Sequence, residues 1–337
     1  MSGPVAEIPA ADIADAEWFA RNVVEPCRPL VLRGAAAAWP AVAAGKASPA
    51  AFGSYLAPFA RATQVGAFVG DAAIRGRYHY GERLAGFNFE HRTMPFTEVV
   101  EAIITSLDHP EASTIYAGSV AIDEVLPGFR ADNPFAFLPA VPPRIWIGHA
   151  STISAHYDTM DNVACVVAGR RRFTLYSPLL TGHLYVGPID HTMAGQPISL
   201  AASSDAPAGT YPLFDAIRDQ ALVAELEPGD ALYLPKLWWH QVEALAPFNV
   251  LVNYWWDAAA IGPDAPYTSL MLAMIAIAER PTAERAAWRA LFDHYVFRPN
   301  GHPLAHLPPE NHGVLGPLRP QNYGRIRAWI MNTLRGN

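Results

Sequence analysis

The segment SAHYDTMDNVACVV, residues 154–167, carries two features from which much of the chain can be interpreted. If the segment is extended, alternate side chains project to the same face, so His156 and Asp158 lie side by side and Tyr157 points away. The run Val163 to Val167 is apolar throughout, as in a buried strand. We therefore expect one imidazole and one carboxylate at the approach to a buried strand.

A second segment, LPKLWWH at residues 234–240, offers a third ligand. A turn and two tryptophans precede His240, which opens another apolar strand. A His-x-Asp tripeptide alone is weak evidence for a metal. Two histidines and one carboxylate on strands, with coordination positions left open, form the facial triad of non-haem iron(II) oxygenases. The sequence thus predicts a catalytic metal site at His156, Asp158 and His240.

Composition limits the classes of protein to consider. The chain has 337 residues, of which 51% are hydrophobic and 16% charged, enough to bury a sizeable core. A formal net charge of −7 disfavours a broad phosphate-binding surface, so we expect no nucleic-acid partner. Cys27 and Cys165 are far apart in the sequence and imply no disulfide framework; a buried free thiol is expected for Cys165.

The expected location follows from what the sequence lacks. Residues 1–15 contain acids and prolines in place of the basic and apolar regions of a signal peptide. The longest apolar run, Leu270 to Ala278, is too short to span a bilayer. We expect a cytoplasmic protein with no membrane partner.

From residue 144 to Trp256 the pattern is short strands punctuated by glycine and proline, which predicts an antiparallel sandwich or barrel. Strands are expected at 144–148, 152–156, 162–168, 171–176 and 231–234, with a hairpin of 240–245 and 249–256 through Ala246-Pro247. Earlier in the chain we expect helices at 12–24, 48–56 and 96–107, and strands at 29–33, 64–69, 77–80 and 113–119.

After Asp257 the pattern becomes helical, with helices expected at 267–280, 282–296 and 321–334. The stretch Leu270 to Ala278 is apolar on all sides, so we expect it to be buried in the core or in a subunit interface. The predicted division is a catalytic domain at 1–260 and a C-terminal helical region at 261–337.

Together these features resemble the JmjC and cupin-like dioxygenases, most closely the branch of the asparaginyl hydroxylase that inhibits hypoxia-inducible factor. The resemblance runs from about Pro29 to Asp257. It implies a mostly β fold, a double-stranded β-helix (jelly-roll or cupin barrel) core with flanking and C-terminal helices. It also implies that His156, Asp158 and His240 bind iron(II) and that 2-oxoglutarate is the cosubstrate.

The resemblance implies a set of residues for that cosubstrate. Arg171 stands where the similar enzymes have a lysine that holds the far carboxylate of 2-oxoglutarate, and an arginine on the apolar face of its strand needs an anion. Tyr116 resembles the tyrosine that binds the same carboxylate. Asn162, Asn253 and Trp255 match family positions near cosubstrate and metal. A structural hydrogen bond for Asn162, a core role for Tyr116 and an outward-turning Arg171 are the alternatives.

The resulting hypothesis is an oxidoreductase, an iron(II)- and 2-oxoglutarate-dependent hydroxylase acting on a protein side chain or a small molecule. One alternative is a cupin metalloenzyme that does not use 2-oxoglutarate, although the usual three histidines and a glutamate are absent. Another is a non-catalytic cupin-fold binding module. The apolar helix near residue 270, with Trp288 and Leu291 on the next helix, suggests a homodimer, because C-terminal helices serve that role in the resembling hydroxylase.

Overall fold

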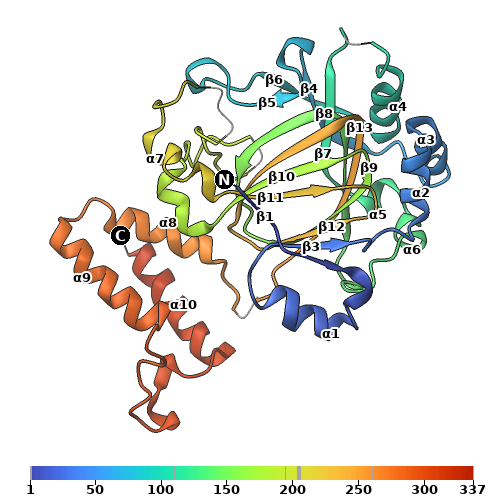
Figure 1. Cartoon of the computed structure of the whole chain (residues 1–337). Helices are drawn as coiled ribbons and strands as arrows, with labels where there is room; N and C mark the ends of the chain where they lie inside the picture. The colour runs from blue at the N-terminus through green and yellow to red at the C-terminus, as the bar shows by residue number, and fades with distance from the viewer. Residues whose placement is uncertain (1, 110, 194, 203–205, 260–261, 337) are drawn as a thin grey trace. The chain divides into compact units, whose positions relative to one another are not determined.

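The computed structural model describes residues 2–109, 111–193, 195–202, 206–259 and 262–336. The chain divides into two compact units, Met1–Ala258 and Ala259–Asn337. The predicted domain boundary, between residues 260 and 261, falls on two residues outside the described part. The first unit is built around a large sheet, and the second consists of helices and turns (Figure 1).

The strands of the first unit are β1 (Gly3–Pro4), β2 (Glu7–Pro9), β3 (Leu30–Arg33), β4 (Gln64–Gly70), β5 (Arg77–Tyr78), β6 (Phe89–Pro95), β7 (Thr114–Ala121), β8 (Pro143–His156), β9 (Asp161–Ala168), β10 (Arg171–Tyr176), β11 (Leu222–Leu226), β12 (Ala231–Leu234) and β13 (Trp239–Trp256). One wall has the strand order β2-β3-β12-β9-β13-β8-β7-β4-β6, while β10 pairs with β11 and β13. This is the mostly β, jelly-roll architecture expected from the resemblance.

The antiparallel pair β8 and β13 belongs to both walls of the barrel. The first part of β13 pairs with β10, with Thr174 opposite Gln241, and its last part pairs with β9, with Asn162 opposite Trp255. Along the whole length of β13, β8 runs on its other side (Figure 1). The barrel mouth therefore gathers the end of β8, the start of β9 and both ends of β13.

The predicted hairpin at Ala246-Pro247 is wrong. Residues Trp239–Trp256 form one strand of 18 residues, and the pairing with β8 only shifts register between Ala244 and Phe248. Proline cannot donate to a strand ladder, but an irregularity in the register accommodates it without reversing the chain. Nearby, the Leu245 N–H donates to the Arg170 carbonyl oxygen, which keeps the chain extended.

Strand β9 lies in the middle of the core, and all eight of its residues are buried. Val163 and Cys165 pack on one side of the sheet, while Ala164 and Val166 pack with Phe173 on the other. Cys165 is a buried free thiol, as predicted, and burial raises its pKa. A strand buried on both faces has the continuous apolar sequence seen here.

The helices of the first unit are α1 (Ala16–Phe19), α2 (Pro40–Ala47), α3 (Pro49–Leu56), α4 (Phe96–Thr105), α5 (Ile122–Val125), α6 (Phe129–Asp132) and α7 (Pro212–Asp215). Helix α3 is capped by Ser48, whose Oγ accepts from the Ala51 N–H at 3.0 Å. Helices α2, α5, α6 and α7 and strands β1, β2, β6 and β11 lie outside the predicted elements. The helix expected at 12–24 is α1 followed by a π-helical turn, Ala20–Val24.

The second unit contains α8 (Pro266–Ile277), α9 (Thr282–Phe292) and α10 (Pro320–Arg335). Although α8 is strongly apolar, none of its residues is buried: Ile275 is 83% exposed and Leu270 48%. The expected burial in the core is therefore wrong, because α8 belongs to a separate unit, and the alternative of a subunit interface stays a prediction. Among the described residues, no helix is both long and apolar enough to cross a membrane.

Candidate metal centre and its cavity

The three predicted ligands meet at the barrel mouth. His156 is the last residue of β8 and lies opposite His240 in the strand pairing, and Asp158 follows in the connection to β9. One ligand atom from each of the three residues lies within 4.8 Å of the other two. The His240 Nε2 atom is 3.7 Å from Asp158 Oδ2, and the two imidazole centroids are 4.3 Å apart.

Both imidazoles are oriented by backbone carbonyls. The Nδ1 atoms of His156 and His240 lie 2.8 Å from the Ser154 oxygen and 2.9 Å from the Trp238 oxygen. A carbonyl oxygen only accepts, so each Nδ1 carries the proton and each Nε2 keeps a free lone pair. Such a hydrogen bond from Nδ1 to a carbonyl oxygen is typical of histidines that bind a metal through Nε2.

A buried carboxylate ties the two segments of the triad together. Asp161, whose side chain is 2% exposed, accepts from the Tyr233 hydroxyl at 3.2 Å and forms an ion pair with Lys236 at 3.3 Å. In the same turn, Leu237 adopts φ +68° and its N–H donates to the Asp158 carbonyl oxygen at 2.7 Å. These contacts hold the connection after β8 against the turn that precedes His240.

The electrostatics favour neutral imidazole at His240. Its burial, followed by the neighbouring His156, lowers the pKa of His240 to about 4, and the Asp158 carboxylate only partly offsets this. Metal ligands must be deprotonated, so a histidine that stays neutral at pH 7 is ready to coordinate. The donor set of two imidazoles and one carboxylate suits iron(II) with open positions.

The triad opens into a cavity of about 520 Å³. Every residue predicted to contact the cosubstrate also lines it: Arg171, Tyr116, Asn162, Asn253 and Trp255. Ile153 lines the same cavity, whereas Thr152 and Ser154 line a second one of about 340 Å³, as strand alternation predicts.

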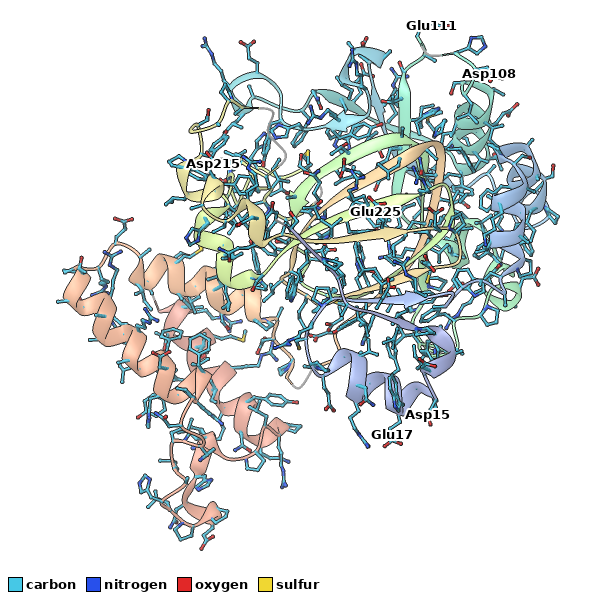
Figure 2. The ribbon with its side chains drawn as sticks, viewed as in Figure 1. Asp15, Glu17, Asp108, Glu111, Asp215 and Glu225 are labelled. Atoms are coloured by element: carbon cyan, nitrogen blue, oxygen red, sulfur yellow. The ribbon has the colours of Figure 1, made fainter. Side chains whose placement is uncertain are left out.

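Arg171 is a buried cation for which the described part of the chain supplies no counter-ion. The residue is 3% exposed, no described carboxylate lies within 4 Å of it, and its Nε has no acceptor. Burial lowers its pKa. On the opposite face of β10, Arg172 pairs with Glu225 of β11 at 2.8 Å; Glu225 is labelled in Figure 2. Arg171 thus faces the cavity, and the outward-turning alternative is wrong.

The other predicted residues contribute polar groups to the wall of the same cavity. Burial raises the pKa of Tyr116, partly offset by Arg171, so its hydroxyl stays protonated and able to donate. Asn253 donates to Asn162 Oδ1 at 3.1 Å and accepts from the Trp146 indole at 2.7 Å. Trp255 Nε1 is buried without an acceptor among the described residues.

Sequence reasoning missed two cavity residues, Arg144 and Gln196. The Gln196 Oε1 atom is buried without a donor in the described structure, and a buried unpaired amide is a group that a ligand can satisfy. Gln196 belongs to the irregular stretch between β10 and β11, and Arg144 follows a proline-rich loop. Neither position is part of a repeating pattern, so no local signal could have selected it.

The comparisons agree with this fold and site. A profile described as "Cupin-like domain" matches residues 15–260, most of the chain. The chain belongs to the cupin-like domain family. The human bifunctional peptidase and (3S)-lysyl hydroxylase JMJD7 is 25% identical over 71% of this cupin-like chain and 80% of its own length. The Jumonji C domain-containing protein 5 of Drosophila melanogaster is 38% identical over 35% of the chain.

A third relative matches about half of the chain. The zebrafish (Danio rerio) tRNA wybutosine-synthesizing protein 5 is 29% identical over 50% of the chain and 54% of its own length. The chain spans only 28% of the fly protein. JmjC members of the family use iron(II) and 2-oxoglutarate, and the residues of this cupin-like chain fit both groups: the triad suits the metal, and Arg171 requires an anion.

Proposed function

We propose that the protein is an iron(II)- and 2-oxoglutarate-dependent dioxygenase that hydroxylates a protein side chain or a small molecule. One observation carries the proposal. A buried arginine without a counter-ion among the described residues shares a cavity with a cluster of two histidines and one carboxylate. An unpaired buried charge is costly, so a dianion that also reaches the metal satisfies both ends of the cavity at once.

The residues would divide the work as follows. His156, Asp158 and His240 would hold iron(II), and Arg171 with Tyr116 would bind the far carboxylate of 2-oxoglutarate. The planar guanidinium suits a bidentate carboxylate, and the Tyr116 hydroxyl adds a donor. Asn162, Asn253 and Trp255 would line the space between. When bound, iron(II) supplies the activation of dioxygen that couples decarboxylation of 2-oxoglutarate to succinate with hydroxylation of a substrate C–H bond.

Two alternatives are disfavoured by particular residues. A cupin metalloenzyme without 2-oxoglutarate would leave Arg171 with no partner. A non-catalytic binding module would not need the paired carbonyl contacts that prepare both imidazoles for a metal. The combination of Asn162, Asn253 and Trp255 in one cavity supports our placement near the asparaginyl hydroxylase branch.

The remaining assignments are part of the same proposal. The net charge of −7 supports a peptide or small-molecule substrate over nucleic acid, although one relative is named for tRNA. We place catalysis in residues 1–260 and a homodimer contact in 261–337, supported by the exposed apolar side chains of α8 and α9. The acidic, cysteine-poor sequence supports a cytoplasmic location.

The test is calorimetric titration of 2-oxoglutarate into anaerobic, iron(II)-loaded protein. We expect micromolar binding, weakened about 100-fold in Arg171→Ala, because a charge-assisted bidentate pair is lost from a buried site. Tyr116→Phe should weaken binding about tenfold, because it removes a single hydrogen bond to a charged group.

Arg172→Ala is the matched control, because Arg172 is the next residue but lies on the opposite face of β10, paired with Glu225. Its affinity for 2-oxoglutarate should equal that of the wild type. If metal-loaded wild type does not bind 2-oxoglutarate, or if Arg171→Ala binds it normally, the proposed cosubstrate is wrong and the metalloenzyme or binding-module reading takes its place.

A further inference from the structure

The cavity contains a second cation that the proposed cosubstrate does not use. Arg144, at the start of β8, lies opposite Asn253 of β13 and lines the cavity. Unlike Arg171 it is only half-buried, and exposed Glu124 lines the same cavity. No described carboxylate lies within 4 Å of its guanidinium. Arg144 is therefore a partly exposed cation in the cavity wall with no ion-pair partner among the described residues.

The backbone of β7 is distorted where it holds this guanidinium. Arg144 Nε donates to Ser119 Oγ at 2.7 Å, and Nη2 donates to the Ser119 carbonyl oxygen. Ser119 adopts φ +56°, a left-handed conformation unusual for serine, where the pairing of β7 with β8 shifts register between Ala117 and Val120. Local backbone strain of this kind is concentrated at functional sites, where surrounding structure maintains it.

The Ser119 contacts leave one face of the guanidinium available. Ser119 engages Nε and Nη2, and no described residue accepts from Nη1. A guanidinium held through two of its nitrogens has a defined orientation. The remaining donor, Nη1, can therefore donate to a ligand with little further loss of side-chain entropy. Fixing the long Arg144 side chain in one rotamer without an ion-pair partner contributes little to the stability of the fold.

The wall of the cavity adds a second donor. Trp255, which lines the same cavity, has a buried indole N–H without an acceptor. Unsatisfied donors are what an anion requires, and each is costly to leave unpaired when buried.

We propose that Arg144, assisted by Trp255 Nε1, binds an anionic group of the substrate, a carboxylate or a phosphate. The inference rests on the proposed function, since it assigns the two arginines of one cavity to two ligands: Arg171 to the cosubstrate and Arg144 to the molecule that is hydroxylated. The reacting carbon would then lie between this anchor and the triad.

The probes are inorganic phosphate and ¹³C-labelled acetate, added separately to protein loaded with manganese(II) and saturated with 2-oxoglutarate. Saturation occupies Arg171, so the remaining anion site is read by paramagnetic relaxation of the ³¹P or ¹³C nucleus near the metal. We expect enhanced relaxation for at least one probe, reduced at least fivefold in Arg144→Gln. The probe that responds identifies the anion. Arg172→Gln, which removes an exposed arginine outside the cavity, should leave the enhancement unchanged.

A second variant separates binding from folding. Ser119→Gly keeps the Arg144 cation, removes the Oγ acceptor and suits the positive φ. We expect it to reduce the relaxation enhancement severalfold without lowering the thermal midpoint. A purely structural role for Arg144 predicts unchanged relaxation in both variants.

The two proposals fail in different ways. Equal relaxation in the wild type and Arg144→Gln, with normal 2-oxoglutarate binding, would overturn the anion anchor and leave the proposed function intact. Arg144-dependent relaxation in a protein that does not bind 2-oxoglutarate would retain the anion site and overturn the proposed cosubstrate.

Discussion

Strand β9 in the barrel and helix α8 in the C-terminal unit are both strongly apolar, yet they differ in exposure. Every residue of β9 is buried, whereas no residue of α8 is. The neighbouring strands β12 and β13 and helix α2 cover β9. The difference shows that an apolar sequence favours burial but does not specify the surface against which it packs. Strand β9 is buried by other elements of the barrel, whereas the apolar side chains of α8 remain exposed.

The largest expected effect is loss of turnover when a candidate metal ligand of the first unit is replaced, with a histidine of the second unit as the control. Replacing His156 or Asp158 by alanine should lower 2-oxoglutarate turnover about 1,000-fold or more, because each removes a ligand from a three-ligand site. Succinate formation measures this. The control is His294→Ala, an exposed histidine of the C-terminal unit, which should retain wild-type turnover. Unchanged succinate production in the His156 or Asp158 variants would remove the metal assignment.

The second prediction addresses the surface of α8. Ile275→Glu should weaken a homodimer by about 3 kcal/mol, because it replaces a side chain of large apolar area with a charge in a buried interface. Sedimentation velocity across micromolar concentrations measures this dissociation. Glu279→Gln, one turn later and past the apolar run, should leave it unchanged. A wild-type monomer at these concentrations would contradict the proposed dimer.

A third prediction tests how tightly the barrel unit is packed. Gly45 lies in α2, where an added Cβ would lie 2.5 Å from the Val167 carbonyl oxygen of β9. A backbone atom in a buried strand cannot move aside cheaply, so Gly45→Ala should lower the free energy of unfolding by about 2 kcal/mol despite its better helix propensity. Chemical denaturation followed by circular dichroism measures the change, and a stabilised variant would show that α2 is loosely packed.

The smallest effect is the same substitution in the other unit, with the opposite sign. Gly324 lies inside α10, and an added Cβ would have no neighbour within 4 Å in the described structure. Gly324→Ala should therefore raise helix stability by about 1 kcal/mol. The denaturation experiment used for Gly45 measures it. A loss of stability here would mean that another surface, such as a second subunit, packs against Gly324.

Some features of the candidate site follow from local sequence, and others do not. The face shared by His156 and Asp158, and the face shared by Arg171 and Phe173, follow from strand periodicity, and the structure places all four in one cavity. The absence of a counter-ion beside Arg171 does not follow from periodicity, because it depends on residues distant in sequence. The same holds for Arg144, whose orientation depends on a distorted residue of a neighbouring strand.

The sequence by itself determined the buried strand β9, the mostly β class and the three candidate metal ligands, because these depend on side-chain chemistry and on spacing between near neighbours. Only the tertiary structure decided that Trp239–Trp256 is one strand and not a hairpin, since both interpretations have the same local pattern and differ in the partner strand. It also decided which charges are paired and which apolar faces are covered. Burial and ion pairing are properties of surfaces that meet, and those surfaces come from distant parts of the chain.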